Sequence, residues 1–115
     1  MNDTQKSQIA FRITEEIYEE YPTLWEKFGD HGRARTEEDN VHHLNHLLTA
    51  YEMKQPHFFV EYTSWLNTVL TSRNVGTHLI IDNYRRLERH LSGSVPKEQE
   101  VFFMDCLAQG KAVLQ

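Results

Sequence analysis

The amino-acid sequence predicts an all-α protein, a single-domain antiparallel bundle of four to six helices over residues 1–115. Three observations predict this class. Apolar residues recur every three or four positions in several segments, as they do on one face of a helix. No segment alternates apolar and polar residues for long enough to form a strand. All three prolines and four of the five glycines lie between the periodic segments, where helices begin and end.

The N-terminal third is predicted to hold a long helix, a short helix and a loop. Isoleucines recur every fourth residue at Ile9, Ile13 and Ile17, which predicts an amphipathic helix over residues 4–20 with acidic residues on its other side. Pro22 restricts the residue before it, so we expect this helix to end there. A short helix over residues 22–29 follows, and the segment after it, up to residue 35, has no period and forms the longest predicted loop.

The rest of the chain divides into four predicted helices. They cover residues 36–53, 57–71, 77–91 and the stretch that begins at residues 94–96. Acidic residues after Thr36 resemble a capping box, which favours a helix start there. The helix after Pro56 carries a broad apolar stripe and is expected to be the most buried. In the last helix, we expect an inner face of Val101, Phe102, Cys106 and Leu107, and Gly110 weakens the prediction of its final turn.

Composition excludes several classes of protein. A content of 39% hydrophobic residues in 115 is too high for a disordered tail and sufficient for one core. The single Cys106 excludes an intrachain disulfide. A net charge of −5 disfavours nucleic acid as a partner. The longest run without Asp, Glu, Lys or Arg has twelve residues, whereas a membrane span needs about 20 apolar ones, and the first residues do not resemble a signal peptide. We therefore expect a cytoplasmic protein with no membrane partner.

A histidine cluster is the densest group of candidate functional residues. Helical spacing places Glu38, His42 and His46 on one face, where they could ligate a divalent transition metal together with a distant histidine. Asp39 lies four residues before His43, so its carboxylate could orient the imidazole in a structural hydrogen bond or a switch. The plainer interpretation places these histidines at the surface, with no cofactor.

No catalytic motif is present. The serines form no nucleophile elbow, the glycines form no phosphate-binding loop, and Cys106 lies among apolar residues, where a thiol is usually inert. We therefore expect the chain not to be an enzyme. The aromatic residues of the helix after Pro56 either fill the core or line a pocket. Because Phe58 and Phe59 are adjacent and point about 100° apart, one of them could face a partner in a homodimer.

Two segments carry a resemblance to a known type of domain. Residues 35–44 contain Glu-Asp-x-x-x-His, and residues 56–75 contain Pro-x-x-Phe-x-x-Tyr-x-x-Trp. In these segments, the chain resembles a helical domain of bacterial sensory and regulatory proteins, found beside modules that bind cobalamin or relay a signal. The resemblance implies ligand-binding roles for Asp39, His43, Tyr62, Trp65 and Arg73.

The function predicted from the sequence is that of a non-enzymatic regulatory or interaction domain in bacterial signalling. Its partner would be a second copy of the chain or another protein. The alternative is a helical sensor that binds a small ligand or a metal through His42, His43 and His46.

Overall fold

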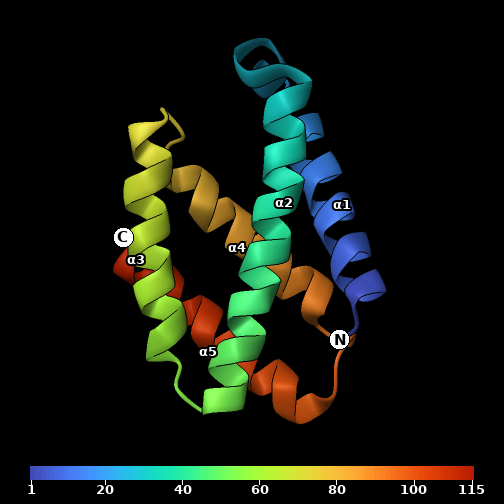
Figure 1. The fold of residues 1–115 in the computed structure, drawn as a ribbon, viewed down its shortest axis with the longest axis vertical. Helices are drawn as coiled ribbons and strands as arrows, with labels where there is room; N and C mark the ends of the chain where they lie inside the picture. The colour runs from blue at the N-terminus through green and yellow to red at the C-terminus, as the bar shows by residue number, and fades with distance from the viewer. The chain divides into compact units, whose positions relative to one another are not determined.

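The computed structural model describes all 115 residues as five helices with no strands, which confirms the all-α class (Figure 1). The helices are α1 (Asp3–Glu20), α2 (Thr23–Met53), α3 (His57–Ser72), α4 (Thr77–Leu91) and α5 (Lys97–Val113). None of them combines the length and the apolar character that crossing a membrane would require. The chain forms two compact units, an N-terminal unit (Met1–Asn45) and a C-terminal unit (His46–Gln115), and the boundary falls within α2.

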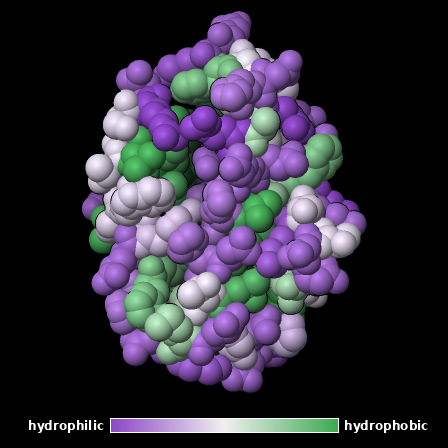
Figure 2. Space-filling view, in the orientation of Figure 1, coloured by the Kyte–Doolittle hydropathy of each residue, from purple (hydrophilic) through white to green (hydrophobic).

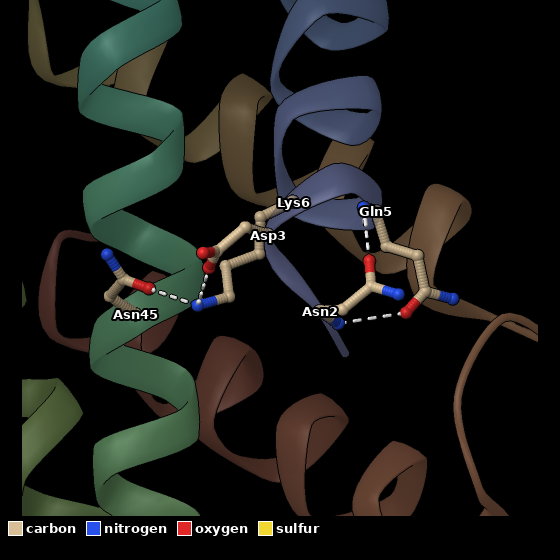
Figure 3. Close-up of polar contacts among 5 residues, drawn as sticks. All are labelled: Asn2, Asp3, Gln5, Lys6 and Asn45. Atoms are coloured by element: carbon tan, nitrogen blue, oxygen red, sulfur yellow. Dashed lines mark hydrogen bonds and ion pairs between the residues drawn. The ribbon is translucent and has the colours of Figure 1, made fainter.

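Helix α1 begins with a capping box. The side chain of Asn2 accepts a hydrogen bond from the Gln5 backbone N–H at 2.8 Å, and the Asn2 backbone N–H donates to the Gln5 side chain at 3.0 Å (Figure 3). One residue further, the Lys6 ammonium donates to Asn45 on α2 at 2.9 Å and lies 3.4 Å from Asp3. The start of α1 is therefore stabilised by its own cap. The Lys6 hydrogen bond connects it to Asn45, the last residue of the N-terminal unit.

Helix α1 buries the face that the isoleucine spacing predicts. Ile13 and Ile17 are buried, and Thr14 is buried with them. The Thr14 hydroxyl donates to the Ala10 carbonyl at 2.7 Å, so the polar group meets its hydrogen-bonding requirement within its own helix. The observed helix starts one residue before the predicted one and ends at the predicted residue.

The predicted loop at residues 29–35 is wrong, because these residues are helical. Gly29 alone leaves helical geometry, with φ 63° and ψ −160°, and the helix resumes directly after it. Only glycine adopts this region of backbone space readily. Gly32 follows at a close approach, since a Cβ there would overlap the Phe28 side chain and lie 3.1 Å from the Tyr18 hydroxyl. The break is thus a kink at Gly29 alone, and the two glycines of this segment do not make it a loop.

The core of the C-terminal unit forms where α5 contacts both α3 and α4. Phe59, Tyr84 and Phe103 are fully buried there. The Thr63 hydroxyl donates to the Phe59 carbonyl at 2.9 Å and lies 2.8 Å from the Tyr84 hydroxyl, so the buried polar atoms are paired.

Two predictions about burial in this unit are wrong. On α5 the buried residues are Phe103, Cys106, Leu107 and Gly110. The prediction is confirmed for Cys106 and Leu107 and wrong for Val101, which is 59% exposed, and Phe102, which is half-buried. Phe103 is buried in their place, because positions 103, 106, 107 and 110 share one face of the helix. Helix α3 is not the most buried, since α4 buries more of its residues and α3 exposes Trp65 to 60%. Figure 2 shows hydrophobic patches separated by hydrophilic residues on the displayed face.

Candidate functional site

Asp39 and His43 lie one helical turn apart on α2. His43 is only 3% exposed, and its neighbour Asn40 is fully buried and donates to the Thr36 carbonyl at 3.0 Å. A side chain with so little exposed surface cannot meet a ligand from solvent without a rearrangement. The structure therefore places the His43 side chain in the interior of the protein and not at a solvent-accessible ligand site.

Tyr62 and Trp65 belong to a group of rings that also includes His46. The His46 imidazole stacks on the Tyr62 ring with centroids 3.7 Å apart and planes 15° apart. The rings of Tyr62 and Trp65 lie 6.1 Å apart at 32°. Tyr62 is buried, whereas His46 and Trp65 are exposed. We call these three residues the aromatic platform. It forms because α3 spaces Tyr62 and Trp65 by three residues and the last turns of α2 supply His46.

Arg73 lies just after α3 and has an exposed side chain. Its backbone N–H donates to the Leu70 carbonyl at 3.0 Å, so its backbone caps the helix. Eight residues along a helix separate it from Trp65, a rise of about 12 Å. Arg73 is therefore not part of the aromatic platform.

The three predicted metal ligands do not form a metal centre in this structure. Glu38 and His42 approach each other at 3.7 Å, one turn apart on α2, and both side chains are exposed. The His46 imidazole is instead stacked on Tyr62. No group of three or more His, Cys, Asp or Glu side chains is arranged so that it could hold a metal ion.

A pocket in the N-terminal unit was not predicted from the sequence. It has a volume of about 370 Å³ and lies between α1 and the first turns of α2. Its lining combines three carboxylates, two guanidinium groups and two aromatic rings, from Arg12, Glu15, Glu16, Tyr18, Glu19, Trp25 and Arg33. The Trp25 and Tyr18 rings meet edge to face, with centroids 4.9 Å apart. This geometry is the preferred one for an aromatic pair and holds the partly exposed Trp25 indole in place.

Two lining residues of the pocket, Tyr18 and Arg33, also interact with other residues of the N-terminal unit. Burial raises the pKa of Tyr18, and a hydrogen bond to Thr36 and the positive charge of Arg33 partly oppose this rise. The Arg33 guanidinium lies 5.2 Å from the centre of the Phe11 ring and 3.6 Å from Glu37. Arg33 thus lines the pocket and also contacts residues outside it, which hold its side chain in position.

Sequence reasoning missed this pocket because it treated its residues separately. The periodicity of α1 predicts a solvated face for its acidic residues, and Trp25 lies in the short helix predicted over residues 22–29. The usable signal was the run of glutamates before Pro22 with no basic residue in the last turn of α1, followed within a few residues by a tryptophan.

Cys106 is not a candidate nucleophile. It is fully buried on α5, and burial, with a smaller contribution from the charge of Asp105, raises the pKa of its thiol to about 12.

Comparison with known proteins gives no match to a family model, to a curated protein or to a solved structure.

Proposed function

We propose that this chain is a non-enzymatic helical interaction and regulatory domain that associates with a second copy of itself. The observation that carries this proposal is the 60% exposure of Trp65 at the edge of the aromatic platform. Tryptophan is the residue most enriched among those that dominate binding energy at protein interfaces.

The contacts of Trp65 support a binding role. Its ring lies against Tyr62, which is itself stacked on His46, so the exposed indole has a restricted range of positions. A side chain that is already ordered loses less conformational entropy when a partner covers it. Three other large apolar side chains of the C-terminal unit are about half-exposed or more, namely Met53, Val101 and Val113. They provide apolar area of the kind that an interface buries.

The setting of this domain is part of the same proposal. Bacterial signalling is supported by the resemblance of residues 35–44 and 56–75 to helical sensory and regulatory domains, and a cytoplasmic location is proposed with it. A regulatory role without chemistry is supported by the buried, protonated thiol of Cys106, since no other nucleophile motif occurs in the sequence.

Sedimentation velocity of the whole chain over a wide concentration range tests the proposal. We expect a reversible dimer that Trp65→Ser weakens by about 30-fold or more, the effect of removing a side chain that dominates an interface. Phe11→Ser is the matched control, because Phe11 is an exposed aromatic residue of α1 and is not part of the platform. A chain that stays monomeric at the highest concentration, or equal dimerisation of the Trp65→Ser variant, contradicts the proposal.

A further inference from the structure

The pocket of the N-terminal unit shares no residue with the aromatic platform, and it has a chemistry of its own. We propose that this pocket binds an organic cation through an ammonium or guanidinium group. The inference does not depend on self-association, and it rests on the size, the aromatic wall and the charge of the pocket.

The size and the aromatic wall suit a small organic ligand. The volume of the pocket, about 370 Å³, lies within the range of about 300–1,000 Å³ typical of small-molecule sites. Trp25 is 40% exposed, so part of its indole is available to a ligand, while the edge-to-face contact with Tyr18 fixes the ring. The face of a tryptophan ring is the strongest cation-binding surface that an aromatic side chain offers. An ammonium or guanidinium group with an alkyl stem meets both requirements.

The charge of the pocket selects a cation. Glu15, Glu16 and Glu19 supply three negative charges against the two positive charges of Arg12 and Arg33, so the lining carries a net charge of −1. Glu37, outside the lining, lies 3.6 Å from Arg33 and offsets part of its charge. The surroundings of a bound ligand are therefore more negative than the lining alone.

The end of α1 adds to this negative potential. A helix carries a partial negative charge at its C-terminus, where basic residues are favourable and acidic ones are not. The last turn of α1 contains no basic residue. Glu15 and Glu19, four residues apart on this helix, repel each other. A bound cation would relieve both unfavourable terms, which gives the site a source of binding energy.

Two sources could supply this chemistry, a free polyamine or a basic side chain of another protein. NMR titration of the whole chain distinguishes them, because the two tryptophans give two indole N–H signals. The probes are spermidine and a short arginine-containing peptide, with MgCl₂ at matched ionic strength as the charge control. We expect the Trp25 signal to shift saturably with either organic cation, and the Trp65 signal to stay in place. Tighter binding of spermidine indicates a free small molecule, and tighter binding of the peptide indicates a protein partner.

Variants test whether the pocket is responsible. The double variant Glu15→Gln with Glu19→Gln changes two exposed side chains, and we expect it to weaken binding by about 10-fold or more. Glu26→Gln is the matched control, since Glu26 is an exposed acid beside Trp25 that does not line the pocket. An unchanged affinity of the double variant, an equal loss with Glu26→Gln, no saturable shift, or an equal shift with Mg²⁺ overturns the proposal.

Discussion

At the scale of single residues, Gly110 shows why one missing side chain matters. In the sequence, a glycine near the end of α5 predicts a weak final turn, because glycine is a poor helix former. In the structure the helix continues through it, and Gly110 is buried. A Cβ at this position would lie 3.0 Å from Tyr84, 3.1 Å from Thr63 and 3.3 Å from Phe59. The glycine therefore permits the close approach of α5 to α3 and α4.

Replacement of Gly110 by alanine is expected to destabilise the protein. All three neighbours are buried and cannot move aside easily, so overpacking costs about 1–3 kcal/mol and the better helix propensity of alanine returns about 1 kcal/mol. The net effect of these two terms is a fall of up to about 2 kcal/mol in the free energy of unfolding, measured in urea. Ala108→Ser, at an exposed position in the same turn, serves as the control and should change it by less than about 0.5 kcal/mol. A stabilised Gly110→Ala variant would show that the three helices can separate without loss.

At the scale of helices, the connection between α4 and α5 depends on one carboxylate. Glu100 accepts a hydrogen bond from the Gly93 backbone N–H at 2.6 Å and lies 3.4 Å from the Lys97 ammonium. Gly93 has a φ of 77°, a conformation that suits glycine. The hydrogen bond from Gly93, and to a smaller extent Lys97, lower the pKa of Glu100. The first turn of α5 therefore holds the end of α4 through an ionised side chain.

Acid is expected to weaken this connection. Because the pKa of Glu100 is lower in the folded state, the unfolded state binds a proton more readily, and stability falls as the pH drops through about 4.5 towards the folded value. Urea unfolding measured across this range should show a smaller acid dependence for Glu100→Gln than for the unchanged chain. Glu98→Gln, an exposed acid in the same turn, is the control. Equal acid dependence in the Glu100→Gln variant would mean that the hydrogen bond to Gly93 does not persist in solution.

At the scale of helices, too, prolines and glycines predicted four of the five helices well. Helix α1 starts within a residue of the prediction, and α4 matches the predicted range. Helix α2 differs from the prediction, because only Gly29 leaves helical geometry and the helix continues from Asp30 through Arg33. Whether a glycine ends a helix or only kinks it depends on the residues that pack around it in the folded protein. The local sequence does not specify these residues.

At the scale of the whole molecule, self-association links stability to concentration. If two chains bind through the Trp65 surface, the folded dimer is favoured by mass action and the melting temperature rises with protein concentration. We expect this rise in calorimetric scans of the unchanged chain and its loss in the Trp65→Ser variant. The Phe11→Ser control should retain it. Concentration-independent melting of the unchanged chain would argue against the dimer even if the surface binds another protein.

The sequence by itself determined the all-α class, most helix boundaries and the buried face of α1, because these depend on periodicity and on the backbone limits of proline and glycine. The resemblance of two segments to helical sensory domains implied binding roles for Tyr62 and Trp65, which stay a prediction. Only the tertiary structure decided that His43 is buried, that His46 stacks on Tyr62, and that the glutamates of α1 meet Trp25 around a pocket. The physical reason is that burial, ring stacking and local potential depend on which helices come together, and spacing along one helix does not specify its neighbours.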